Sequence, residues 1–116
     1  MNPAWPRMLA VAIAAAAALV SHAGATADPG PERQRELLVL LKQDCGSCHG
    51  MRLTGGLGPA LTPEALRTKP AESLAATIYH GRTGTAMPPW RRFVSEAEAQ
   101  WLVARIMSGA TDVDLR

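Results

Sequence analysis

The sequence has few cysteines, few aromatic residues and little net charge, on each of which whole classes of protein depend. Its 116 residues include two cysteines, one tyrosine and one phenylalanine, and 12 basic against 10 acidic residues give a formal net charge of +2. Two cysteines exclude a disulfide-dense toxin, and so small a charge without any basic run argues against nucleic-acid binding. The length has room for one domain, which excludes a membrane protein of several spans and makes an enzyme with a roomy active site unexpected.

The first 27 residues have the pattern of a secretory signal peptide. Arg7 is the only charge before the apolar run Met8–Val20, and small residues follow as far as Ala27. A basic flank, a short apolar stretch and a small-x-small ending are typical of a segment that is cleaved on export. A membrane anchor would need about 20 apolar residues, which this run does not reach. We therefore expect an exported mature domain of residues 28–116, cleaved after Ala27 or, as second choice, after Ala23.

The expected mature domain is poor in aromatic side chains. It contains four: Tyr79, Trp90, Phe93 and Trp101. A chain of this size buries only about two-thirds of its unfolded surface, and such chains often depend on a metal, a disulfide or a cofactor. The question is therefore which of these completes the core.

Apolar spacing and capping residues predict an all-α domain of short helices joined by loops rich in glycine and proline. Ser95 and Glu98 form a capping box before the last helix, and Gly81 and Gly109 are typical residues to end a helix. No stretch alternates as a strand would. The predicted helices cover residues 34–44, 62–67, 70–80 and 95–108, and the main loops cover residues 50–61 and 81–90.

Residues 45–49 read Cys-Gly-Ser-Cys-His, the attachment signature of haem c. On a helix Cys45, Cys48 and His49 stand at i, i+3 and i+4, so they project from one face. Two thiols at this spacing reach the two vinyl groups of one porphyrin, and the imidazole that follows points under the ring at the iron. Leu38 and Leu41 are expected to continue this face in steps of three and four. The spacing predicts one covalent haem c with His49 as an axial iron ligand.

Other uses of these residues fit less well. A redox C-x-x-C would follow a strand, and the sequence offers none. A zinc site needs four ligands, and the adjacent Cys48 and His49 do not easily close a tetrahedron. A plain disulfide between Cys45 and Cys48 is the remaining alternative in an oxidising compartment. Export, the helical pattern and the adjoining histidine together favour haem c.

The second axial ligand of the iron decides what the haem can do. His22 leaves with the signal peptide, and Met51 is too close to the histidine of the motif to reach the other face of the ring. Met107 is expected to fill the core from the last helix, and His80 to be a cation at a helix end. Met87 lies in a loop that two prolines stiffen, which suits a thioether held over the iron. We therefore predict Met87 as the sixth ligand.

Pro59 is the expected partner of the axial histidine. A histidine bound to a metal normally donates its other ring N–H to an acceptor, and the carbonyl of Pro59 is free to accept. The alternative is that Pro59 only makes a turn.

Together these segments resemble the class I cytochromes c. The resemblance rests on the motif at residues 45–49, on Gly-Pro-x-Leu at 58–61, and on Met-Pro at 87–88 before a last helix with Trp101 and Leu102. In that family the first and last helices cross near the haem, the equivalent proline orients the histidine, and methionine caps the iron. The resemblance implies that fold, with Trp101 and Leu102 meeting Leu37, Leu38 or Leu41.

Longer segments, at residues 45–50, 55–66 and 84–90, are similar to a narrower group. This group is the small periplasmic monohaem cytochrome encoded beside the dissimilatory nitrite reductase of denitrifying bacteria. The similarity implies a one-electron carrier, not an enzyme, that donates electrons to the nitrite reductase or helps to finish its haem d. Nothing in the sequence separates these two functions. The expected partners are the reductase and an upstream electron donor. We expect a monomer without nucleic acid and without stable membrane insertion.

Overall fold

The computed structural model describes residues 27–112, so the predicted signal peptide lies outside the described residues except for Ala27. Within residues 27–112 all regular structure is helical, which confirms the all-α prediction. The elements are α1 (Pro31–Leu40), the π-helical turn η1 (Leu41–Cys45), α2 (Gly46–His49), α3 (Pro63–Leu66), α4 (Ala71–His80) and α5 (Glu96–Ser108). None of the helices in this part of the chain is long and apolar enough to cross a membrane.

Local sequence signals fix the ends of several helices. The side chain of Thr62 accepts a hydrogen bond from the backbone of the first turn of α3. At α5 the predicted capping box is present, because Ser95 accepts from the N–H of Glu98 while the Glu98 carboxylate accepts from the N–H of Ser95. Gly109 ends α5 with a φ of 73°, a left-handed conformation that glycine adopts without strain. These boundaries agree with the sequence-based prediction.

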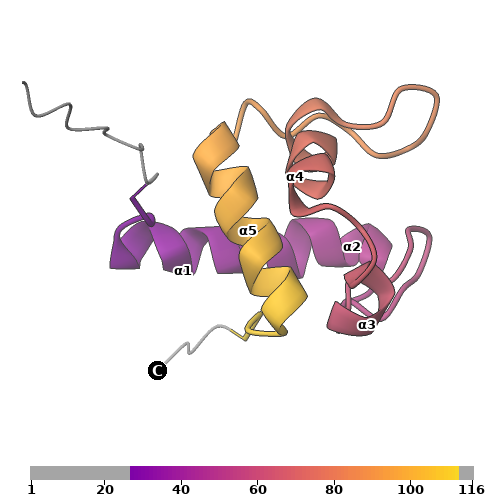
Figure 1. Cartoon of the computed structure of the whole chain (residues 1–116), viewed down its shortest axis with the longest axis horizontal. Coiled ribbons are helices and arrows are strands. Elements are labelled where there is room, and N and C mark those ends of the chain that lie inside the picture. Colours follow the sequence, from indigo (N-terminus) through magenta and orange to yellow (C-terminus); the bar gives the residue numbers. More distant parts are fainter. Residues whose placement is uncertain (1–26, 113–116) are drawn as a thin grey trace, which may run out of the picture.

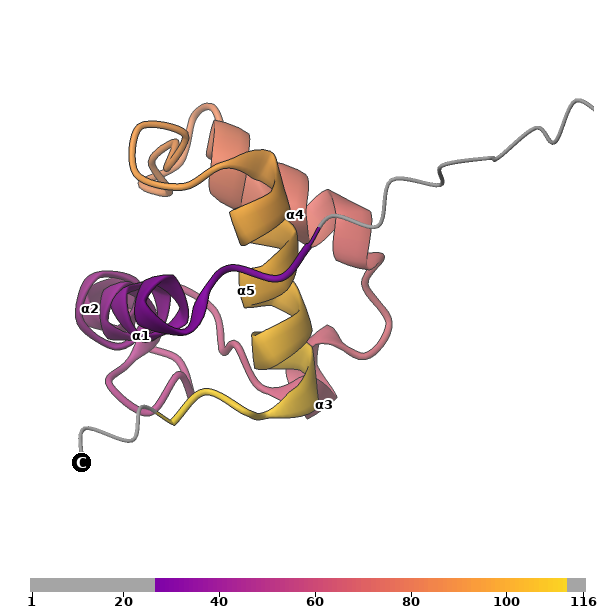
Figure 2. The ribbon, with the colours of Figure 1, turned by 90° about the vertical axis from the view of Figure 1, so that its left-hand side faces the viewer.

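The first and last helices cross and share the core (Figure 1). In the view of Figure 2, α4 lies on the opposite side of α5 from α1, and all three helices contribute side chains to the core. Trp101 and Leu102 belong to the same buried cluster as the leucines of α1 and η1, which confirms the expected pairing of the helices. The buried apolar side chains are Leu37, Leu38, Leu41, Leu53, Leu66, Ala75, Val94, Ala99, Trp101, Leu102, Val103 and Ile106.

One arginine joins the N-terminal ends of these two helices. Nε of Arg33 donates to Oε1 of Glu98 at 2.7 Å, and its Nη2 donates to the backbone carbonyl of Phe93 at 2.7 Å. Its Nη1 donates to Glu36 on the next turn of α1 at 2.8 Å. The hydrogen bond from Arg33 holds the pKa of the Glu98 carboxyl below its usual range. Arg33 therefore links α1, α5 and the segment that leads into α5.

The first helix differs from the prediction at both ends, because it begins at Pro31, three residues earlier than expected, and its C-terminal end is not a regular α-helix. We expected α-helix through residue 44, but α1 ends at Leu40 and the chain continues as the π turn η1. The N–H of Gly46 accordingly donates to the carbonyl of Leu41, five residues earlier. A π turn takes more residues than an α turn, so Cys45 is rotated about the helix axis from the position that an uninterrupted α-helix would give. The spacing of three and four residues, by which we expected Leu38 and Leu41 to continue the face of the motif, therefore ends at Leu41.

Candidate haem site

The two cysteines of the motif differ in their surroundings. Cys45 ends the π turn and packs against the core, and burial raises the pKa of its thiol to about 11. Cys48 lies on α2 and is exposed. Both are free thiols, so the structure has no disulfide between them. Both sulfur atoms are thus available to bond, one at the edge of the core and one at the surface.

His49, the last residue of α2, has the backbone partner that the sequence suggested. Its Nδ1 lies 2.6 Å from the carbonyl oxygen of Pro59. A carbonyl oxygen only accepts, so Nδ1 carries the hydrogen and donates it. This tautomer leaves the lone pair of Nε2 free for a metal.

The loop over residues 50–61 is held against the motif by its own backbone. The N–H of Gly55 donates to the carbonyl of His49, and the N–H of Gly58 donates to the carbonyl of Cys48, each at 2.8 Å. A Cβ at Gly58 would lie 2.8 Å from Cε1 and Nδ1 of His49, and one at Gly56 would lie 2.8 Å from the Cys48 carbonyl oxygen. Only glycine allows the backbone to come so close. These two contacts were not predicted from the sequence, although the glycine-rich run after the motif was a signal for them.

Met87 is half-buried in a loop whose two ends are held close together. Its carbonyl accepts from the N–H of Arg82 at 3.1 Å, and its N–H donates to Oγ1 of Thr85 at 3.3 Å. Gly81, which ends α4, has a φ of 70°, and a Cβ there would lie 2.7 Å from the nitrogen of Pro89. The backbone on both sides of Met87 is therefore fixed by hydrogen bonds and by this close approach.

The rejected ligand candidates lie where their alternative roles would put them. Met51 is 63% exposed at the start of the loop over residues 50–61. His80 is exposed at the end of α4, with its ring edge-on to Tyr79 at 4.9 Å between centroids. Met107 packs against the core from α5.

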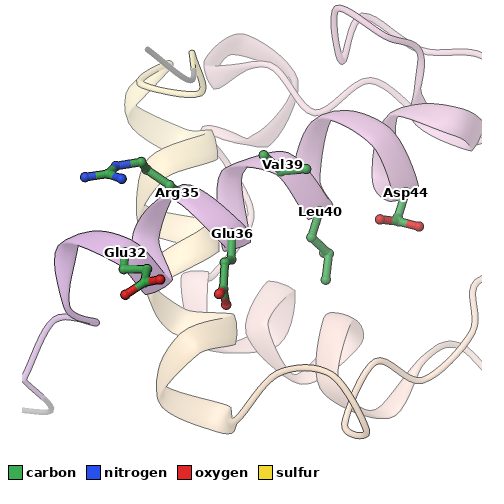
Figure 3. A pocket seen from close by; sticks show the side chains of 6 residues that line it. All are labelled: Glu32, Arg35, Glu36, Val39, Leu40 and Asp44. Atoms are coloured by element: carbon green, nitrogen blue, oxygen red, sulfur yellow. The ribbon is translucent and has the colours of Figure 1, made fainter. Parts of the chain in front are cut away.

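The loop that carries Met87 and the α1–α2 run lie on the same side of α5 (Figure 2). On α1, Leu40 projects toward this loop (Figure 3). An open depression of about 450 Å³ follows this side of α1, but it contains none of the predicted haem-binding side chains. Its lining residues, labelled in Figure 3, are Glu32, Arg35, Glu36, Val39, Leu40 and Asp44.

The side chains present fit a haem c. The chain offers two free thiols three residues apart, a histidine with Nε2 free, and a methionine on a fixed loop. Several apolar side chains at the edge of the core remain only partly buried, as a porphyrin packed beside the core would need. Within residues 27–112 no group of three or more His, Cys, Asp or Glu is arranged to hold a metal ion, such as the zinc alternative would need. The partly buried residues are Leu40, Leu61, Leu74, Ile78, Tyr79, Trp90 and Met107.

Comparisons with known proteins agree with this fit. The family model described as cytochrome c oxidase, cbb3-type, subunit III matches residues 32–105. Cytochrome c55X of Pseudomonas aeruginosa is 64% identical over 81 residues, which are 70% of this chain and 68% of that protein. The solved structure of the c-type cytochrome NirC is 61% identical, with a TM-score of 0.71 over 72% of this chain and 98% of its own.

A longer enzyme contains a similar segment. The dihydro-haem d1 dehydrogenase of Pseudomonas aeruginosa is 43% identical over 67 residues, which are 57% of this chain but only 13% of the enzyme. The NirC structure confirms the class I cytochrome c fold, and the family match confirms a covalently bound haem c. The chain therefore belongs to the c-type cytochromes of the cbb3-type subunit III family, and it is an electron carrier rather than an enzyme.

Proposed function

We propose that this cytochrome is a periplasmic one-electron carrier whose iron is held by His49 and Met87, and that it donates electrons to the haem c/haem d nitrite reductase of denitrification. The observation that carries the ligand assignment is the fixed orientation of His49, whose Nδ1 is 2.6 Å from the Pro59 carbonyl. The export pattern of the first 27 residues supports the location, and the likeness to cytochrome c55X and NirC supports the partner.

His49 is held in one orientation by two contacts. The Pro59 carbonyl fixes its tautomer, and the backbone at Gly58 lies against its ring. A hydrogen-bonded Nδ1 makes Nε2 a better donor to a metal. Neither contact depends on a mobile side chain. The imidazole would therefore keep its position when a bound iron changes its oxidation state. A carrier needs this, since structural change on oxidation would slow electron transfer.

Met87 supplies the property that separates a carrier from a gas-binding protein. When bound, haem supplies a one-electron couple between ferrous and ferric iron. A thioether is a soft and neutral donor, so it favours the ferrous state and holds the potential high. Hydrogen bonds at the base of its loop hold the backbone beside Met87, and its thioether, if bound to the iron, would leave no position there for oxygen, nitrite or carbon monoxide.

The two cysteines would hold the porphyrin by thioether bonds. Cys45 would anchor it to the core, where its sulfur is partly buried, and Cys48 would anchor it at the exposed end of α2. An exposed attachment point leaves a short route by which electrons enter and leave. This arrangement serves outer-sphere electron transfer and does not need a substrate pocket.

A second function is favoured by one observation, the similarity to part of a dihydro-haem d1 dehydrogenase. A dehydrogenase releases electrons that need an acceptor. In this alternative the cytochrome accepts electrons during maturation of the haem d of the nitrite reductase, with the same two iron ligands. The two functions differ in partner and in the direction of transfer.

The ligand assignment is tested with Met87→Ala. We expect the variant to have a lower reduction potential, to lose the weak Fe–S charge-transfer band of the oxidised protein, and to bind carbon monoxide when reduced. Met107→Ala is the matched control, because Met107 packs against the core and should leave all three properties unchanged. If Met87→Ala is silent and His80→Ala opens the iron, the site is bis-histidine and the high-potential carrier is wrong.

The partner is tested by stopped-flow mixing. The reduced cytochrome is mixed with oxidised nitrite reductase, and the oxidised cytochrome is mixed with dihydro-haem d1 dehydrogenase and its substrate. Oxidation in the first reaction, at a rate that saturates with reductase, supports donation to the reductase. Reduction in the second reaction alone would replace the donor function by the maturation function.

A further inference from the structure

The loop that carries Met87 leaves the end of α4 and returns to it (Figure 1). The N–H of Trp90 donates to the carbonyl of Ile78 at 3.0 Å, and the N–H of Arg91 donates to the carbonyl of Tyr79 at 3.3 Å. Both carbonyls belong to the last turn of α4, where a helix leaves them without partners of its own. The two ends of the loop are thus anchored on one helix. The residues between these anchors must be ordered by contacts within the loop itself.

A tight turn orders the first part of this loop. The N–H of Thr85 donates to the carbonyl of Arg82 at 3.1 Å, which is the bond between the first and fourth residues of a β-turn. Gly84, the third residue of the turn, has a φ of 79°, a conformation that favours glycine at this place. The N–H of Arg82 in turn donates to the carbonyl of Met87 at 3.1 Å. The turn therefore lies directly beside the backbone of the methionine.

The hydroxyl of Thr85 joins this turn to Met87 a second time. Its Oγ1 lies 2.8 Å from the carbonyl oxygen of Arg82 and 3.3 Å from the backbone nitrogen of Met87. A carbonyl only accepts and an N–H only donates, so the hydroxyl gives its one proton to Arg82 and accepts from Met87. Among the described residues, no other side chain of the loop bonds to the loop backbone. Thr85 is therefore the one side chain that connects the turn to the N–H of the methionine.

The prolines that follow Met87 do not replace this contact. Pro88 restricts the backbone of the residue before it to extended conformations, which acts on the C-terminal side of Met87. A proline has no N–H to donate, and neither proline bonds to the N–H of Met87. The two sides of the methionine are thus fixed by different means, a proline ring after it and the Thr85 hydroxyl before it.

The exposure of Thr85 separates its effect on Met87 from any effect on the fold. The side chain is exposed and is absent from the core. Water can satisfy the Arg82 carbonyl and the Met87 N–H when the hydroxyl is removed, so the loss should change the stability of the domain little. Water does not hold these two groups at a fixed separation, however. Removal of the hydroxyl should therefore act on the placement of Met87.

We propose that Thr85 is a positioning residue for Met87, whose backbone its hydroxyl holds in the arrangement that keeps the sixth position of the iron closed. The inference rests on the proposed function, in which Met87 binds the iron. It deepens that function by naming the group that determines how rarely this ligand leaves.

The test titrates the haem-loaded ferric protein with imidazole and follows the loss of the weak Fe–S band. Imidazole binds only the fraction of molecules whose sixth position is open, so its apparent Kd falls in proportion as that fraction rises. Thr85→Val keeps the branched shape and removes the hydroxyl. We expect it to lower the apparent Kd about three- to tenfold, the factor that one neutral hydrogen bond supplies. Its melting temperature should change by less than about 4 °C.

The chain offers a matched control in the same loop. Thr83 is exposed like Thr85, but its hydroxyl makes no hydrogen bond to any described residue. Thr83→Val therefore removes the same group without the contact and should bind imidazole as the wild type does. Thr85→Ser keeps the hydroxyl and should also have the wild-type Kd.

Each other outcome overturns the inference. A wild-type Kd in Thr85→Val, with or without a lower melting temperature, would mean that Thr85 serves at most the fold. An equal effect of Thr83→Val would assign the change to the polarity of the loop, and an equal effect of Thr85→Ser would assign it to the methyl group.

Met87→Ala separates this inference from the proposed function. If Met87→Ala does not tighten the binding of imidazole, Met87 is not the sixth ligand, and the proposed function fails together with the inference. If Met87→Ala tightens the binding but Thr85→Val does not, the ligand assignment stands and only the role of Thr85 is overturned.

Discussion

Gly58 makes the contact with His49 that a single methyl group can test most directly. In Gly58→Ala the new Cβ would lie 2.8 Å from both Cε1 and Nδ1 of the imidazole. The backbone of Gly58 does not have a positive φ, so alanine introduces no dihedral strain there. The variant therefore isolates the steric contact between the loop and the ring.

The size of the effect follows from the distance. Ordinary contacts of a Cβ begin at 3.4 Å, so the ring or the loop must retreat by about 0.6 Å. Overpacking of this kind typically costs about 1–3 kcal/mol. For a domain of this size each kcal/mol lowers the melting temperature by roughly 4–8 °C, so we expect a decrease of at least about 4 °C. A movement of the ring would also lengthen or bend the 2.6 Å hydrogen bond to Pro59.

Two measurements follow this change. Thermal unfolding by circular dichroism gives the melting temperature, and a redox titration gives the potential. A weaker hydrogen bond at Nδ1 makes His49 a poorer donor to ferric iron, so we expect the potential of Gly58→Ala to rise. Gly30→Ala is the control, because no heavy atom lies within 4 Å of its added Cβ. A Gly58→Ala protein with the melting temperature and potential of the control would refute the packing of the loop against the ring.

Two further predictions concern the contacts between α1 and α5. Since the folded pKa of Glu98 is lowered, its stabilising effect is complete above the pKa of an unfolded glutamate, about 4.3, and is lost as the pH falls through the folded value. Glu98→Gln should therefore lower the free energy of unfolding by about 1 kcal/mol at pH 7. Urea unfolding at several pH values should show that the difference in this free energy between the variant and the wild type shrinks below about pH 4. A difference that stays constant with pH would contradict the linkage. Trp101 is 8% exposed, and the Arg105 guanidinium lies 5.3 Å from its ring centroid. Trp101→Ala should lower the free energy of unfolding by about 3–5 kcal/mol in the same assay. Phe93→Ala should change the free energy of unfolding by less than about 0.5 kcal/mol, and an equal loss in both variants would mean that Trp101 does not fill the core.

The helix boundaries could be predicted because their causes are local. Thr62, Ser95 with Glu98, and Gly109 act on backbone groups within a few residues, so their pattern in the sequence is sufficient. The four candidate haem-binding residues could also be proposed from local patterns. Two thiols and an imidazole stand at a fixed spacing, and a methionine stands between small residues and prolines. Their roles as iron and porphyrin ligands stay predictions.

The contacts that position the motif could not be predicted in the same way. The hydrogen bonds from Arg33 to Glu98 join residues that are 65 positions apart, and either residue alone reads as an exposed charge. The π turn over Leu41–Cys45 has no side-chain cap, and no residue pattern in the sequence marked it. The approach of Gly58 to the His49 ring depends on where the loop folds back, which the glycine alone does not determine.

The way in which the loop over residues 50–61 is built has a consequence for the evolution of this cytochrome. The hydrogen bonds that hold this loop to the motif come from backbone atoms, and its close contacts come from glycines. The side chains at positions 51, 52 and 57 are exposed, so they lie outside these contacts. Natural variation at these three positions can therefore change the surface of the cytochrome while the backbone contacts to the histidine stay the same. Surface chemistry and the setting of the histidine are thus encoded by separate atoms of one short segment.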